Sequence, residues 1–94
     1  MNLTDLFQII LDRKNNPTES SYTARLLAAG EDAVLKKIGE EAMEVILAAK
    51  GQGDQRLIEE LADLTYHSLV LLAARNLDLS DVKAELEKRH ALKK

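Results

Sequence analysis

Two stretches of the chain carry acidic residues at helical spacing. KKIGEEAMEV places Glu41 three residues before Glu44, and IEELADL places Glu60 three residues before Asp63. Residues three apart lie side by side on an α-helix, so each pair would present two neighbouring carboxylates. Oxygen ligands of this kind suit Mg²⁺, a hard cation that proteins usually bind through a few carboxylates together with substrate phosphates. The two pairs therefore predict a magnesium site if the fold brings them together.

The same acids have a plainer interpretation as solvated charges on exposed helices, where the E-x-x-E spacing is common. Helical arithmetic at about 100° per residue places Glu41 at the edge of an apolar stripe rather than on a free face. A carboxylate at the edge of a core requires a compensating positive charge. Lys37, one turn before Glu41, supplies one such charge, which is too few for four carboxylates. We therefore predict metal ligands at Glu41, Glu44, Glu60 and Asp63, with Glu40 as an extra ligand or as an acid beside them.

Hydrophobic periodicity supplies two long helices to position these acids. We predict one helix over about 32–50 and another over about 54–76, joined by GQGD with Asp54 as the N-cap. An antiparallel pairing would make the acid pairs face each other, because both lie a few helical turns from the connection. The stripes expected to face the core are Val34, Ile38, Ala42, Val45 and Ala49 in the first helix, and Leu57, Leu61, Leu64, Ser68, Leu71 and Leu72 in the second.

Three shorter segments complete the predicted fold. Residues 3–13 have the spacing of an amphipathic helix, Ser20 or Ser21 would cap a short helix that Gly30 ends, and Ser80 would cap a final helix. No segment shows the alternation of a β-strand. The sequence thus predicts an all-α fold, a helical bundle around a central antiparallel helix hairpin, in one domain over residues 1–94.

Composition limits the classes of partner. The formal net charge is −3 without a basic block, which argues against binding to nucleic acid. The absence of cysteine excludes thiolate metal sites. No apolar run approaches the roughly 20 residues of a membrane span, and no signal peptide opens the chain, so we expect a cytoplasmic protein. The hydrophobic content of 46% exceeds what one small core absorbs, which predicts a homodimer.

Four segments together resemble a known family: SYTARLL, KKIGEEAMEV, ELADLTYHSLVLLAAR and LEKRH. The chain is similar over essentially its whole length to the phosphoribosyl-ATP pyrophosphohydrolases, within the MazG-like all-α superfamily of nucleoside triphosphate pyrophosphohydrolases. The resemblance implies Mg²⁺-dependent hydrolysis of phosphoribosyl-ATP to phosphoribosyl-AMP and pyrophosphate, the second step of L-histidine biosynthesis. It also implies an ATP-binding homodimer, here in the stand-alone form without a fused cyclohydrolase. The acid motif of the superfamily is matched at four residues, which are the expected catalytic set: Glu41, Glu44, Glu60 and Asp63.

Substrate contacts are expected at Lys37, Tyr22 and Thr23, and each also has a structural explanation. Lys37 could meet a phosphate or merely offset the repulsion between the acids. Tyr22 and Thr23 belong to the family-like SYTA segment, but Tyr22 could simply pack and Thr23 could bond locally. The identity of the general base stays open, with Glu41 at the buried edge as one candidate.

Three other functions fit part of the pattern. A housecleaning (d)NTP pyrophosphohydrolase would use the same acidic metal site on other nucleotides, and a substrate panel separates it from the first reading. A di-iron carboxylate bundle requires Glu-x-x-His on two helices, whereas only Glu87 and His90 show that spacing. A helical interaction module without catalysis would leave the acids as solvated charge and would show no response to Mg²⁺.

Overall fold

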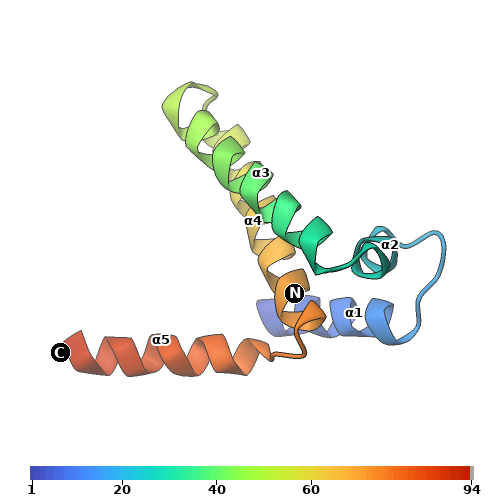
Figure 1. The fold of residues 1–94 in the computed structure, drawn as a ribbon. Helices are drawn as coiled ribbons and strands as arrows, with labels where there is room; N and C mark the ends of the chain where they lie inside the picture. The colour runs from blue at the N-terminus through green and yellow to red at the C-terminus, as the bar shows by residue number, and fades with distance from the viewer. Residues whose placement is uncertain (94) are drawn as a thin grey trace.

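The computed structural model describes residues 1–93 and contains five α-helices and, within these residues, no strand. The all-α prediction is therefore confirmed. The helices follow one another through short connections, and Figure 1 shows that the two longest lie side by side at the centre. Their bounds are α1 Leu3–Asn15, α2 Tyr22–Ala29, α3 Glu31–Gly51, α4 Asp54–Ala74 and α5 Leu79–Lys93.

The central hairpin consists of α3 and α4, which run antiparallel and have 21 residues each. At 1.5 Å per residue each helix is about 31 Å long. Gly53 permits the tight connection because its φ of +88° is a conformation that glycine adopts without steric cost. Gly53 is also the N-cap of α4, and Asp54 is the first helical residue rather than the predicted cap.

Capping residues set most of the remaining helix ends. The Ser21 side chain accepts a hydrogen bond from the Ala24 amide at 3.1 Å and caps α2, as one of the two predicted alternatives. Gly30, with φ +104°, ends α2 and begins α3. The cap predicted at Ser80 is wrong, because α5 already begins at Leu79. The Asp81 carboxylate instead accepts a hydrogen bond from the Asp78 amide at 2.9 Å.

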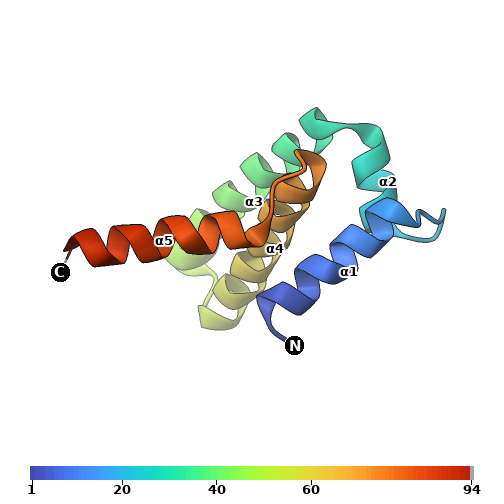
Figure 2. The ribbon, with the colours of Figure 1, turned by 90° about the horizontal axis from the view of Figure 1, so that it is seen from below.

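The hydrophobic core lies where α1 and α2 pack against one end of the hairpin (Figures 1 and 2). Its buried members are Phe7, Ile10, Leu26, Val34, Leu69, Val70, Ala73 and Leu79. The predicted stripes are only partly correct, since Ala48 rather than Ala49 is buried in α3. In α4, Leu61 and Ser68 are exposed. Because α4 has apolar residues on more than one side, periodicity alone did not select the face that carries Glu60 and His67.

Apolar side chains remain exposed on the outer face of the hairpin. Met43, Ile46 and Leu47 on α3 and Ile58 on α4 are each more than half exposed. Figures 1 and 2 also show α5 extending away from the other four helices. The predicted dimer would cover such surface and stays a prediction. None of the described helices combines the length and the apolar character that crossing a membrane requires.

Candidate metal and active site

The hairpin brings three of the predicted acidic residues together. Glu41 comes from α3, Glu60 and Asp63 come from α4, and one carboxylate oxygen of each lies within 4.8 Å of the other two. We call these three residues the carboxylate cluster. Glu44, one turn beyond Glu41, is exposed and close enough to Glu60 to share a proton with it. Glu40 is exposed and does not belong to the cluster.

Two members of the carboxylate cluster are buried without full compensation. Glu60 is 1% exposed and Glu41 is 6% exposed. The Oε2 atoms of both residues are buried and accept no hydrogen bond from any donor of the protein. A buried acceptor without a partner costs about 1–3 kcal/mol, and more when it is charged. The surface-charge interpretation is therefore wrong for Glu41 and Glu60, and the orphaned oxygens are suited to a cation.

Two basic side chains partly neutralise the cluster. Lys37 Nζ lies 3.6 Å from Glu41 Oε1, and Arg56 Nη2 lies 2.7 Å from Glu60 Oε1. Arg56 also contacts Glu59 at 3.1 Å. The sequence interpretation overlooked Arg56, although its i,i+4 spacing from Glu60 signals such a pair. With Glu44 included, four carboxylates meet two cations, so the site still carries excess negative charge.

Glu44 and Glu60 influence each other's protonation. A proton shared with Glu44, together with burial, raises the pKa of Glu60 from 4.5 to about 7, although the positive charge of Arg56 opposes the shift. The same hydrogen bond from Glu60 lowers the pKa of Glu44, assisted by Arg56 and Lys37. The metal-free site therefore tends to hold a proton at Glu60 near neutral pH. A cation that binds there must displace this proton.

The predicted substrate residues of α2 contact α4. The Tyr22 hydroxyl lies 3.1 Å from Nε2 of His67, and the Thr23 hydroxyl is hydrogen-bonded to the Tyr66 hydroxyl. Thr23 is buried, but it bonds across to α4 rather than locally as its structural explanation supposed, whereas Tyr22 is 45% exposed. His67 was not among the predicted site residues. Its position four residues after Asp63, on the same flank of the helix, was the available signal.

The neighbours of Lys37 favour its charged form. Slight desolvation would lower the pKa of Lys37, but the Tyr22 hydroxyl and the carboxylates of Glu41 and Glu40 outweigh it and raise that pKa. The side chain is only partly exposed, and it contacts the carboxylate cluster through Glu41. The lysine thus remains protonated in a position from which it can also meet an anionic substrate.

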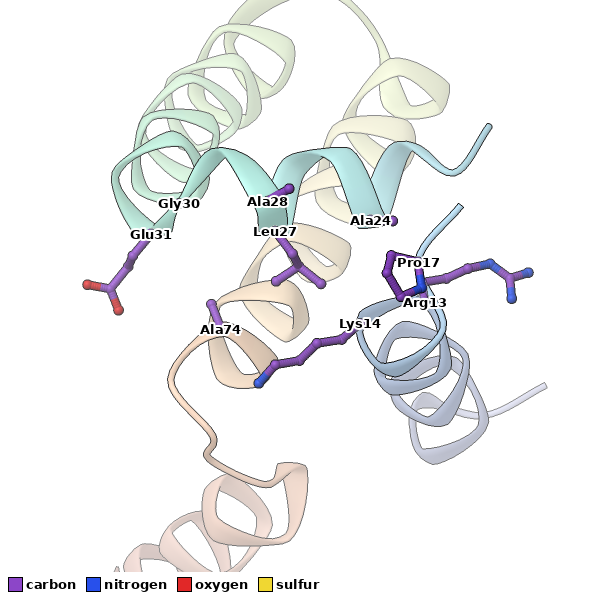
Figure 3. A pocket seen from close by; sticks show the side chains of 9 residues that line it. All are labelled: Arg13, Lys14, Pro17, Ala24, Leu27, Ala28, Gly30, Glu31 and Ala74. Carbon is purple, nitrogen blue, oxygen red and sulfur yellow. The ribbon is translucent and has the colours of Figure 1, made fainter. Parts of the chain in front are cut away.

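A separate cavity of about 430 Å³ lies between the end of α1, α2 and the end of α4. Figure 3 shows Lys14 and Leu27 among the side chains that line it, together with Ala74 at the end of α4. Lys14 Nζ donates to the Ala73 carbonyl at 2.7 Å and to Asn76 Oδ1 at 2.6 Å. Lys14 therefore caps the C-terminus of α4, and the carboxylate cluster does not line this cavity.

The helical hairpin and its buried carboxylates fit the class of all-α pyrophosphohydrolases. Residues 3–90 match the family described as phosphoribosyl-ATP pyrophosphohydrolase. The chain belongs to the phosphoribosyl-ATP pyrophosphohydrolase family, which confirms the resemblance found in the sequence.

Curated relatives cover most of the chain. A phosphoribosyl-ATP pyrophosphatase of Trichlorobacter lovleyi is 55% identical over 87 residues, which are 93% of this chain and 81% of the relative. One from Clostridium botulinum is 51% identical over 87 residues, with coverage of 93% and 79%. The histidine biosynthesis bifunctional protein HisIE of Nostoc sp. is 48% identical over 87 residues, with coverage of 93% of this chain and 40% of that protein.

Proposed function

We propose that this chain hydrolyses phosphoribosyl-ATP to phosphoribosyl-AMP and pyrophosphate, the second step of L-histidine biosynthesis. One water molecule is consumed, one P–O bond of the triphosphate breaks, and the water oxygen forms the new P–O bond. The observation that carries the proposal is the pair of buried, orphaned oxygens of Glu41 and Glu60 in a chain that matches this family over residues 3–90. We further propose that residues 1–94 constitute a single domain with this activity.

The donor set fits Mg²⁺. Ligands about 2.1 Å from an octahedral ion lie at most about 4.2 Å apart, and the oxygens of the carboxylate cluster lie within 4.8 Å of one another. A small closure of the hairpin side chains therefore suffices. In this proposal Glu41, Glu60 and Asp63 hold the metal directly, with Glu44 beside them and Glu40 on the exposed rim. When bound, Mg²⁺ would supply positive charge against the triphosphate and the leaving pyrophosphate.

The side chains of the protein have distinct tasks in this proposal. A carboxylate of the cluster that is not fully engaged by the metal accepts the proton of the attacking water, and Glu41 is the candidate because it has a buried oxygen without a donor. Lys37, 3.6 Å from Glu41, is placed to bind a phosphate oxygen. Tyr22 and Thr23 position the nucleotide from α2, with the buried Thr23 holding α2 against α4 through its hydrogen bond to Tyr66.

A homodimer belongs to the proposal. The exposed apolar residues Met43, Ile46 and Leu47 of α3 and Ile58 of α4 offer a surface whose burial stabilises association by about 25 cal/mol per Å². A cytoplasmic location also stays a prediction and agrees with a biosynthetic role.

The decisive experiment measures pyrophosphate release from phosphoribosyl-ATP, ATP and a panel of deoxynucleoside triphosphates, each with Mg²⁺ and with EDTA. We expect turnover of phosphoribosyl-ATP alone, and only with Mg²⁺. Turnover of the other triphosphates instead would favour a housecleaning enzyme with the same site. No turnover of any of them would contradict the enzymatic proposal.

A further inference from the structure

The hydrogen bond between Tyr22 and His67 joins α2 to α4 and has a defined direction. His67 Nδ1 lies 2.8 Å from the Asp63 carbonyl oxygen, and a carbonyl can only accept, so Nδ1 carries the proton. His67 is 5% exposed, so its ring nitrogens meet the protein rather than solvent. In the neutral ring Nε2 is then an acceptor. The Tyr22 hydroxyl, 3.1 Å from Nε2, must donate its only proton to His67.

This direction determines what the exposed side of Tyr22 can bind. With its proton engaged by His67, the Tyr22 oxygen has only lone pairs to offer, so it accepts hydrogen bonds and repels a phosphate oxygen. The ring is also in edge contact with His67, at a centroid distance of 6.0 Å. Even so, Tyr22 remains 45% exposed, and His67 connects it to the backbone of Asp63 in the carboxylate cluster. The Tyr22 oxygen is therefore fixed by His67, accessible from outside, and able to accept a hydrogen bond from an uncharged donor group of the substrate.

We propose that Tyr22 accepts a hydrogen bond from a neutral donor of the nucleotide, a sugar hydroxyl or the adenine amino group, and that His67 is the positioning residue that fixes Tyr22 for it. This inference rests on the proposed function and adds to it the kind of group that Tyr22 recognises. It assigns different parts of the substrate to two residues, because Lys37 then binds a phosphate group whereas Tyr22 binds the nucleoside part.

The test compares steady-state hydrolysis of phosphoribosyl-ATP by the wild type, Tyr22→Phe, His67→Leu, His67→Gln and the Tyr22→Phe/His67→Leu double variant. Tyr22→Phe retains the ring and removes the oxygen, so we expect KM to rise about threefold to tenfold with kcat nearly unchanged. His67→Leu should raise KM similarly, and the double variant should be no worse than Tyr22→Phe alone. In His67→Gln the amide oxygen still accepts from Tyr22, so this variant should restore most of the affinity.

Two controls separate positioning from general damage. The affinity for Mg²⁺ alone should be the same in all variants, since neither side chain belongs to the carboxylate cluster. Ser68→Ala removes an exposed hydroxyl bonded to the Leu64 carbonyl at 2.8 Å and should leave KM unchanged. Competition by AMP, 2′-deoxy-AMP and IMP identifies the donor, because 2′-deoxy-AMP lacks the 2′-hydroxyl and IMP lacks the adenine amino group. If Tyr22 accepts from one of these groups, Tyr22→Phe should abolish the preference for AMP over the nucleotide that lacks that group.

The outcomes distinguish this inference from the proposed function. An active wild type with an unchanged KM in Tyr22→Phe would overturn the assignment of Tyr22, even if His67→Leu failed to fold. A raised KM in His67→Leu that His67→Gln does not correct would overturn the positioning role of His67. A wild type that does not hydrolyse phosphoribosyl-ATP would overturn the proposed function, and this inference with it.

Discussion

At the scale of single residues, the protonation of Glu60 governs how the site meets a cation. Its pKa of about 7 means that the folded, metal-free protein binds a proton at pH values where an unfolded chain, with the ordinary value of 4.5, has released it. Ionisation of Glu60 is therefore disfavoured in the native state. The free energy of unfolding of the metal-free protein should decrease as the pH rises from about 4.5 to 7. The lowered pKa of Glu44 acts at lower pH, because the stability that it contributes is complete above about 4.5 and is lost as the pH falls further.

The same protonation predicts proton-linked binding of Mg²⁺. Because the ion and the proton compete for Glu60, the apparent affinity for Mg²⁺ should rise with pH up to about 7 and then level off. Calorimetry at pH 6 in two buffers with different ionisation enthalpies measures the proton released per ion. Glu60→Gln should abolish the release together with most of the binding. Proton release that is absent in the wild type would contradict the coupling.

Two exposed acids test the metal assignment without disturbing the core. Glu44→Ala and Asp63→Ala should each lower kcat/KM by at least about 100-fold, because both remove a ligand or a neighbour of the metal. Far-UV circular dichroism should change little, since both side chains are exposed. Glu85→Ala on α5, where Glu85 is exposed and paired with Arg89 at 3.1 Å, is the matched control and should retain activity. Full activity of either site variant would contradict the assignment.

The sequence was informative about which acids meet, and less so about what surrounds them. Helical spacing and an antiparallel hairpin suffice to bring Glu41 to Glu60 and Asp63. The ion pair of Arg56 with Glu60 was within reach of the same spacing rule. The bond between Tyr22 and His67 was not, because it depends on how α2 crosses the hairpin and on which face of α4 is buried. These are tertiary choices that local patterns do not encode.

At the scale of helices, the number, type and order of the elements could be predicted, since the first four helices have apolar residues at helical spacing and Ser21 and Gly30 mark helix ends. The faces were less certain. Both long helices have apolar residues around much of their circumference, so several stripes satisfy the period of 3.6. The structure buries the stripe of α4 that contains Glu60 and His67 and leaves Leu61 exposed. Two polar residues of the candidate site, Glu60 and His67, thus lie on the buried face that the hydrophobic pattern did not select.

Two glycines of the hairpin region should respond oppositely to alanine. Gly39 lies inside α3 with nothing within 4 Å of an added Cβ, so Gly39→Ala should stabilise the fold by about 0.5–1 kcal/mol. Gly30 has φ +104° and ψ 167°, a region nearly exclusive to glycine, so Gly30→Ala should cost about 1–3 kcal/mol. Urea unfolding monitored by circular dichroism measures both. Equal effects of the two substitutions would contradict the backbone argument.

At the scale of the whole molecule, the exposed apolar face of the hairpin predicts self-association. Sedimentation should give twice the 10.5 kDa of one chain. Ile46→Lys, at a side chain that is more than half exposed on α3, should shift the equilibrium toward the monomer, because a charge then lies in the proposed interface. Leu3→Lys on α1 is the control, with a similarly exposed side chain. A wild type that sediments as a monomer would contradict the homodimer.

The orphaned oxygens of Glu41 and Glu60 also bear on how the molecule opens. Buried oxygens without hydrogen-bond partners in the middle of the hairpin weaken the region where the two longest helices meet, so local opening there should need less free energy than opening near Val34 and Val70. Amide hydrogen exchange around Glu41 and Glu60 should be fast in EDTA and slow in Mg²⁺, while amides near Val34 change little. In that case the ion would hold the two helices of the hairpin together. The availability of magnesium would then set the lifetime of the folded enzyme as well as its rate of hydrolysis.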